Sequence, residues 1–217
     1  MVSPDFVTMR RAMIDSQLRT SGVTEPWIIA AMGSLAREAF VPADRSATAY
    51  MDRAIPLARA RALNPPLACG LMLGAAQVKA DDNILLIGAG TGYLAHLLAG
   101  RAAAITALEQ SSELADRARA NLKTFANVRV VEGALNEGSQ AGAPYSLIII
   151  DGAIAALPDA IAAQVGEGGR VVAGLIDGAV SRLAAGYKRG GAVVLRPIAD
   201  CEIATLPGFE PAKEFVF

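Results

Sequence analysis

The second half of the chain consists of short apolar runs separated by segments with helical spacing. Runs without polar alternation are typical of parallel strands that are covered on both faces. We expect strands at NILLIG (83–88), AITALE (104–109), VRVVEG (128–133), SLIIIDG (146–152) and RVVAGLI (170–176). Residues 112–124, which begin with a serine cap, and residues 157–165 are expected to form crossover helices. The pattern predicts an α/β fold with a mostly parallel sheet.

The N-terminal part has a different pattern, which predicts a helical layer. Residues 5–20 have the spacing of an amphipathic helix, and Thr24 is positioned to cap a second helix with Pro26 in its first turn. Asn64 and Pro65 are expected to be the N-cap and first residue of a third helix that runs to about residue 75.

The last part of the pattern predicts that an antiparallel hairpin closes the sheet. Residues 180–188 and 192–198 form two extended runs around a glycine-containing turn. A length of 217 residues fits one domain, with residues 1–76 as the N-terminal layer and 77–217 as the sheet core.

Composition narrows the expected partners. A net charge of −1 and a pI near 5.9 give no summed positive field, so we expect small molecules or proteins rather than nucleic acid or membrane. Cys69 and Cys201 are far apart and His96 is the only histidine, which makes a metal site improbable. Charged residues interrupt the N-terminal segment, so we expect no export signal and a cytoplasmic enzyme.

The strongest local signal is ILLIGAGTGY (84–93), in which a buried strand leads through Gly88, Gly90 and Gly92 into a helix. Three glycines allow a sharp turn and bring backbone N–H groups at a helix N-terminus against a ligand. Glu109 ends the next strand, 21 positions after Gly88, where its carboxylate can accept both hydroxyls of a ribose. With Gln110 beside it, this arrangement predicts a site for an adenosine cofactor.

The glycine spacing distinguishes between adenosine cofactors. A dinucleotide fingerprint needs a small residue three positions after its second glycine, where this chain has Tyr93. The pattern G-x-G-x-G suits a cofactor without pyrophosphate, and S-adenosylmethionine is such a molecule. An NAD enzyme, or a tight turn without a ligand, are the alternatives.

Other strand ends extend the expected cofactor site, because ligands of open α/β sheets lie at the carboxyl edge of the strands. Gly133 and Ala134 follow the third strand. Asp151 ends the fourth, where its carboxylate can meet the cationic side of the cofactor, or can be a helix cap or surface turn residue.

The chain offers little for general base catalysis, and this favours a carboxylate as methyl acceptor. We expect His96 to pack rather than to act chemically, because no serine, cysteine or carboxylate motif accompanies it. Methyl transfer from a sulfonium to an oxygen depends mainly on positioning, and a carboxylate is already ionised at pH 7.

Several segments together resemble the protein-L-isoaspartate O-methyltransferases, over about residues 9–175. REAFVP followed by AYMDRAIPL is fairly specific to that family, and the GAGTGY loop, NVRVVEG and PYSLIIIDGA agree with it. The resemblance implies a Rossmann-like S-adenosylmethionine-dependent methyltransferase fold. It also implies a cytoplasmic repair enzyme that methylates the α-carboxylate of isoaspartyl residues in damaged proteins.

Residues 58–66, ARARALNPP, stand where the family usually has a segment close to GHGQTISQP, which forms the substrate pocket beside the cofactor. In this register Asn64 takes the place of the family's serine, which faces the carboxylate, and so is the catalytic candidate. The register places Leu63 with Arg59 and Arg61 at the acceptor site. The two arginines can hold an anionic acceptor, or they can be solvated loop residues.

Two further departures from the family pattern affect the cofactor. Leu86 stands where the family commonly has an acid, and Ala134 stands where it has an aspartate that contacts adenine. The sequence therefore leaves three hypotheses: isoaspartyl repair, an S-adenosylmethionine-dependent enzyme with a different acceptor, which can be a small molecule, and a catalytically silent fold that binds a partner protein. The sequence does not indicate an oligomeric state.

Overall fold

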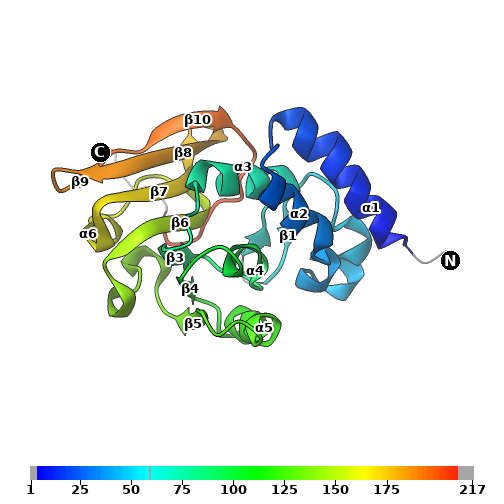
Figure 1. The fold of residues 1–217 in the computed structure, drawn as a ribbon, viewed down its shortest axis with the longest axis horizontal. Coiled ribbons are helices and arrows are strands. Elements are labelled where there is room, and N and C mark those ends of the chain that lie inside the picture. The colour runs from blue at the N-terminus through cyan, green and yellow to red at the C-terminus, as the bar shows by residue number, and fades with distance from the viewer. Residues whose placement is uncertain (1–3, 59, 210–217) are drawn as a thin grey trace, which may run out of the picture.

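The apolar runs of the second half pair into one sheet with the strand order β10-β8-β7-β6-β3-β4-β5 (Figure 1). The computed structural model describes residues 4–58 and 60–209. The strands of this sheet are β3 (Asn83–Ile87), β4 (Ala104–Glu109), β5 (Val128–Glu132), β6 (Tyr145–Ile154), β7 (Val165–Asp177), β8 (Val180–Arg189), β9 (Ala192–Val193), which pairs with β8, and β10 (Arg196–Asp200). The neighbours from β7 to β5 are parallel, whereas β8 and β10 are antiparallel. The predicted parallel sheet with a closing hairpin is confirmed.

Helices cover both faces of the sheet, which explains why its strands lack polar alternation. Along β3, Ile84 and Leu86 belong to one apolar core, and Leu85 and Ile87 belong to the other. The helices of the first core are α3 (Pro66–Ala76), α4 (Tyr93–Ala99) and α5 (Ser112–Leu122). Helix α6 (Asp159–Gln164) and the segment with Leu206 and Phe209 pack on the second core.

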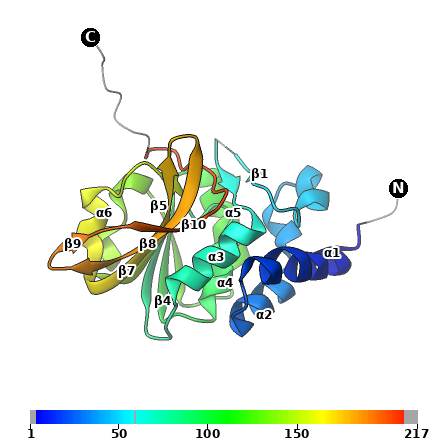
Figure 2. The same cartoon turned by 90° about the horizontal axis from the view of Figure 1, so that it is seen from above.

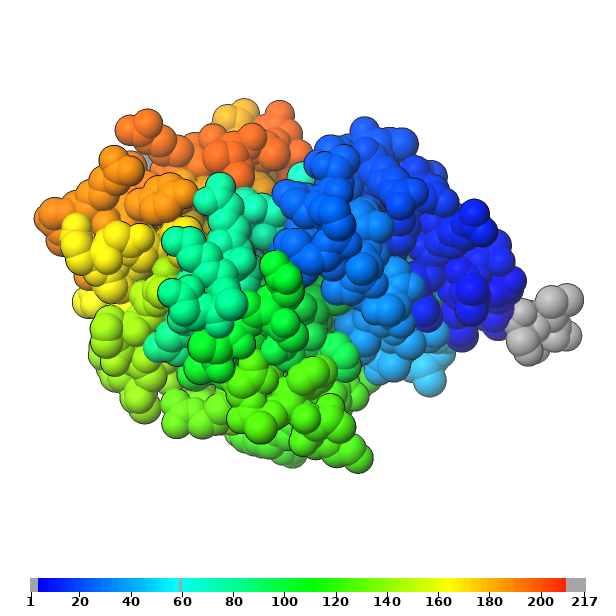
Figure 3. Space-filling model, viewed as in Figure 1, coloured from blue at the N-terminus to red at the C-terminus, as the bar shows by residue number. Residues whose placement is uncertain are grey.

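The N-terminal layer lies beside α3 and joins the first core (Figures 2 and 3). It contains α1 (Phe6–Met13), α2 (Pro26–Ser34) and a short hairpin of β1 (Ile55–Pro56) and β2 (Ala62–Leu63). Short 3₁₀ helices at Arg37–Phe40 and Ala43–Thr48 connect α2 to this hairpin.

Two helix predictions in this layer are wrong in detail. Residues 5–20 do not form one α-helix, because a π-helical stretch, Ile14–Leu18, and a 3₁₀ turn, Arg19–Ser21, follow α1. The Ser16 hydroxyl donates to the Ala12 carbonyl at 2.6 Å, a side-chain bond that competes with the regular helical pattern. The N-cap of α2 is Glu25 rather than Thr24, because Pro26 takes the first helical position.

Within the described ranges, none of the helices has the length and apolar character needed to cross a lipid bilayer.

A buried ion pair between Asp82 and Arg170 fastens the sheet to α3. The Asp82 carboxylate accepts hydrogen bonds from the Ser146 hydroxyl, the Lys79 amide and the Arg170 guanidinium. Arg170 also donates to the carbonyl of Ala76 at the end of α3. Burial opposes the charge of Asp82, but these hydrogen bonds hold the pKa of its carboxyl below the ordinary value.

We predict that Asp82→Ala lowers the free energy of unfolding by about 3 kcal/mol, because it leaves the Arg170 charge buried without its anion. Urea unfolding at pH 7 measures the change. Asp177→Ala is the matched control, since Asp177 pairs with Arg182 at the surface and its loss should cost less than about 1 kcal/mol. Equal losses in the two variants would contradict this account.

Candidate active site

The glycine loop between β3 and α4 has the backbone conformation that its sequence requires. Gly88, Gly90 and Gly92 all have positive φ, at 82°, 55° and 91°. This left-handed region is accessible to glycine without steric cost. Gly92 has a second reason to lack a side chain, because a Cβ there would lie 3.0 Å from Leu122 of α5.

Four N–H groups of this loop are used within the protein, which differs from the prediction that they face a ligand. Gly88 and Ala89 both donate to the Leu108 carbonyl, and Gly92 donates to the Ala89 carbonyl. The Gly90 N–H donates to Glu109 Oε2 at 2.7 Å. The loop therefore fixes Glu109, and its three glycines leave room beside the backbone where side chains would otherwise stand.

Glu109 ends β4 as a fully buried carboxylate that three backbone N–H groups hold in place. Its Oε1 accepts from the Gln110 N–H at 2.9 Å and the Ser111 N–H at 3.1 Å, while Oε2 accepts from Gly90. Such bonds stabilise the ionised form of a carboxylate. Glu109 is thus a rigid acceptor at the carboxyl edge of the sheet.

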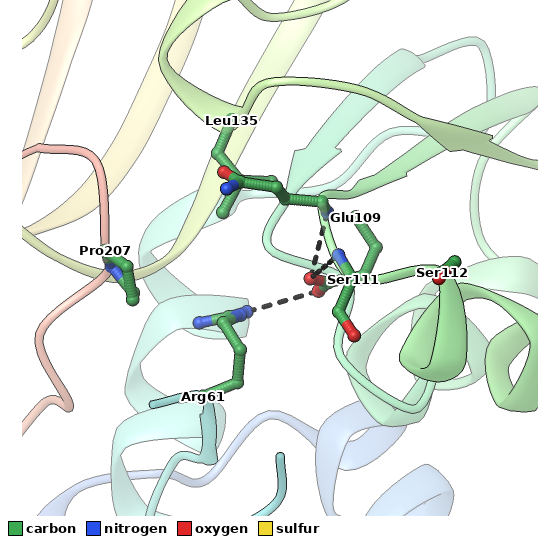
Figure 4. Close-up of a pocket in the computed structure, with 7 residues that line it drawn as sticks. Arg61, Glu109, Ser111, Ser112, Leu135 and Pro207 are labelled. Carbon is green, nitrogen blue, oxygen red and sulfur yellow. Dashed lines mark hydrogen bonds and ion pairs between the residues drawn. The ribbon is translucent and has the colours of Figure 1, made fainter. Parts of the chain in front are cut away.

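A cavity of about 300 Å³ opens beside Glu109 (Figure 4). Its described lining residues are Arg61, Glu109, Gln110, Ser111, Ser112, Leu135 and Pro207. Sequence reasoning named the first three of these, but not the serines, Leu135 or Pro207. The Ser111 hydroxyl accepts from the Leu114 N–H and caps α5, which begins at Ser112. The two consecutive serines after β4 indicate a cap at this place, since serine is a preferred N-cap residue.

Residues Gly133 and Ala134 are not among the lining residues, although they were expected at the cofactor site. The Gly133 N–H donates to the Glu109 carbonyl, and Ala134 is exposed. Their neighbour Leu135 lines the cavity in their place.

Arg61 lies over the glycine loop. Its Nη2 donates to the Gly88 carbonyl at 2.9 Å and lies 3.4 Å from Glu109 Oε2 (Figure 4). The Arg61 N–H donates to the Ala58 carbonyl, Ala60 has a φ of 60°, and strand β2 begins directly after Arg61, at Ala62. The other arginine expected at the acceptor site, Arg59, lies outside the described residues.

The space beside Gly88, where a side chain would otherwise stand, is filled by the side chains of other residues. A Cβ on Gly88 would lie 2.8 Å from Arg61 Nη2 and 3.0 Å from Leu206 Cδ1. Leu206 is held there by its N–H, which donates to the carbonyl of Ala153 in β6. No pattern in the sequence indicates that Leu206 contacts the glycine loop.

Asn64 is buried and joins three distant parts of the chain. Its Nδ2 donates to Asp151 Oδ1 at 2.6 Å, and its Oδ1 accepts from the Ala204 N–H at 2.8 Å. Because the side chain is engaged in this way, it does not cap α3, which begins at Pro66 with Pro65 as its N-cap. The predicted Asn64 cap is wrong. Leu63 packs in the first core and does not line the cavity.

Asp151 lies inside β6, which continues to Ile154, and its side chain is buried. It is therefore neither a helix cap nor a surface turn residue. Burial raises the pKa of Asp151, while the hydrogen bond from Asn64 and the positive charges of Arg61 and Arg37 oppose this rise. The backbone oxygen of Asp151 would lie 3.5 Å from a Cβ on Gly88, so the residue borders the same space beside Gly88.

Arg37 is a fully buried arginine that sequence reasoning missed. Its guanidinium donates to the carbonyls of Ala49 and Asn64 and lies 4.6 Å from the centroid of the Tyr93 ring. It fastens the segment with Asn64 to the start of α4. Nothing in the letters REAFVP indicates that this arginine is interior.

Two side chains of residue types that often act in catalysis, His96 and Cys69, do not line the cavity. The His96 ring makes edge contacts with Phe40 and Phe125, and burial lowers its pKa, in agreement with the predicted packing role. Burial raises the pKa of the Cys69 thiol to about 12, which leaves it protonated and unreactive at neutral pH. In the part of the chain that the structure describes, no three His, Cys, Asp or Glu side chains are grouped to hold a metal ion.

Comparison with known proteins gives a consistent result. Residues 9–207 match the family model described as protein-L-isoaspartate(D-aspartate) O-methyltransferase (PCMT). A protein-L-isoaspartate O-methyltransferase of Koribacter versatilis is 34% identical over 97% of this chain and 99% of its own length. One of Methylorubrum populi is 37% identical over 75% of this chain and 77% of its own length.

A solved structure shares the fold. It is a Plasmodium falciparum protein assigned to the protein-L-isoaspartate O-methyltransferases, in complex with S-adenosyl-L-homocysteine. The TM-score is 0.75 at 14% identity, over 94% of this chain and 99% of that one.

We predict that Asp151→Asn raises the stability of the protein at pH 7. The native pKa of this carboxyl lies above its unfolded value, so its ionisation at neutral pH opposes folding, and the amide removes that cost. The advantage of the variant should shrink as the pH falls and the wild-type carboxyl becomes protonated. Urea unfolding at several pH values, with the exposed Asp44→Asn as control, measures this; a variant less stable than wild type at pH 7 would refute it.

Proposed function

The chain belongs to the protein-L-isoaspartate(D-aspartate) O-methyltransferase family, and we propose from this membership and from its site that it repairs isoaspartyl residues in proteins and peptides. It is an S-adenosylmethionine-dependent methyltransferase, and the acceptor in this proposal is the free α-carboxylate of the isoaspartyl residue. The proposed setting is the cytoplasm.

The residues of the cavity fit the nucleoside part of the methyl donor. Glu109 is an oriented, buried acceptor for ribose hydroxyls, and Leu135 and Pro207 provide apolar lining across the cavity. The volume of about 300 Å³ is at the lower end of ligand pockets. The fixed carboxylate of Glu109 beside this cavity is the observation that carries the proposal.

When bound, S-adenosylmethionine supplies a methyl group activated by a sulfonium. The contribution of this chain is to orient the two partners and to exclude water from between them. The backbone carbonyl of Asp151 borders the glycine loop at Gly88, and its buried carboxyl group, when ionised, would favour the cationic part of the donor. The Asn64 side chain donates a hydrogen bond to the carboxyl group of Asp151 and so connects it to residues 58–66, which form the acceptor site in this proposal.

An acceptor carboxylate suits this site because it needs no proton removed. A carboxylate is ionised at neutral pH, whereas an amine or phenol acceptor commonly needs a base. His96 is packed between aromatic rings and Cys69 is held as a thiol, so neither is available for that role.

A different acceptor is the second candidate, and the Asn64 side chain favours it. Both of its polar atoms are already bonded, to Asp151 and to the Ala204 N–H, and the side chain is fully buried, so it is not free to turn toward a substrate carboxylate. An S-adenosylmethionine-dependent enzyme for another, anionic acceptor would keep the donor site unchanged.

We predict that the purified protein transfers labelled methyl from S-adenosylmethionine to an isoaspartyl peptide as a base-labile ester. The matched aspartyl peptide, which has no free α-carboxylate at that residue, should remain unlabelled. Labelling of neither peptide at high enzyme concentration would exclude the repair proposal.

We predict that Glu109→Gln raises the KM for S-adenosylmethionine about tenfold or more, the loss of one hydrogen bond to a charged acceptor. Glu113→Gln, an exposed change in the first turn of α5, is the control and should leave the KM unchanged. An unchanged KM in Glu109→Gln would remove this residue from the donor site.

A further inference from the structure

We propose that Arg61 couples the two substrates: its guanidinium occupies the donor site until the donor displaces it, and the displaced guanidinium then binds the carboxylate of the acceptor. This inference rests on the proposed function and assigns to one residue an order of binding, with the donor first.

The first observation is steric. Arg61 Nη2 lies so close to Gly88 that even a methyl group on this glycine would be 2.8 Å away. A ligand atom that uses the bare surface of Gly88 therefore requires the guanidinium to leave. The Arg61 side chain and a bound donor exclude each other at this point.

The second observation concerns the hydrogen-bonding capacity of Glu109. A carboxylate offers about four acceptor positions. Three of them receive the N–H groups of Gly90, Gln110 and Ser111, and the guanidinium of Arg61 is directed at the fourth. A ribose hydroxyl can therefore be accepted in good geometry once Arg61 has moved away.

The third observation is that Arg61 is loosely held where it lies. Its distance of 3.4 Å to Glu109 is longer than the 2.7–2.9 Å of a strong charge-assisted bond. Its Nε is buried without a hydrogen-bond partner in the described part of the protein. Among the described residues, the guanidinium is bonded through Nη2 alone, mainly to the Gly88 carbonyl at 2.9 Å. Displacement thus breaks one good hydrogen bond.

The fourth observation is that Arg61 follows a residue at the surface. The Arg61 N–H donates to the Ala58 carbonyl, and Ala60, the residue before Arg61, is exposed. In this proposal a change of side-chain rotamer moves the guanidinium away from Gly88, toward the side from which a protein acceptor approaches. Among the described residues that line the cavity, Arg61 is the only lysine or arginine, so it is the group there that can neutralise an acceptor carboxylate.

The test measures donor-site affinity and acceptor kinetics of Arg61→Ala. Because the apparent Kd rises as the fraction of open sites falls, we expect calorimetry to give about fivefold tighter binding of S-adenosylhomocysteine in the variant. The KM for an isoaspartyl peptide should rise about tenfold, because one charge-assisted hydrogen bond to the peptide carboxylate is lost, and kcat should change little. Arg53→Ala, an exposed arginine of the same layer, is the control and should match wild type in both measurements.

The outcomes separate this inference from the proposed function. Binding to the variant that equals or falls below that of wild type would overturn the inference and leave the proposed function intact. Tighter binding with an unchanged peptide KM would overturn the acceptor half of it. Absence of binding to wild type, with binding to the variant, would support the displacement strongly. Absence of binding to both folded proteins would remove the proposed function and this inference together.

Discussion

The candidate site depends on one interaction, the bracing of the Glu109 carboxylate by backbone N–H groups. A buried carboxylate without partners would become protonated or would destabilise the fold. Here the turn at Gly90 and the first residues after β4 direct three N–H groups at it, and the positive φ values of the glycine loop make that turn possible. The strand, the glycines and the carboxylate therefore form one unit, and the cavity lies beside it.

A set of buried ionisable side chains extends from this unit to residues 61–64 and to Arg37. Arg37 and Arg61 carry guanidinium groups, Glu109 and Asp151 carry carboxyl groups, and all four side chains are buried. Asn64 lies among them, donating to Asp151 through its side chain and accepting from Arg37 through its carbonyl. A change in one charge alters the balance felt by the others, so donor binding and acceptor binding share an electrostatic environment.

The sequence predicted the fold and the central residues well where the physical signal was local. Uninterrupted apolar runs predicted the parallel strands, and the glycine spacing with the acid at the end of β4 predicted that Glu109 lies at the glycine loop. The rest depends on distant contacts. The side chain of Asn64 bonds to residues 151 and 204, which explains why its expected capping role failed. Similarly, the turn at Ala60 sends Arg61 to the glycine loop, and no pattern along residues 58–66 shows where that turn closes.

The most direct test is a crystal structure of the protein with S-adenosylhomocysteine. The account predicts that a ribose hydroxyl donates to the Glu109 carboxylate and that the Arg61 guanidinium has left the Gly88 carbonyl. A nucleoside bound elsewhere, or one bound at Glu109 while Arg61 still covers Gly88, would contradict it.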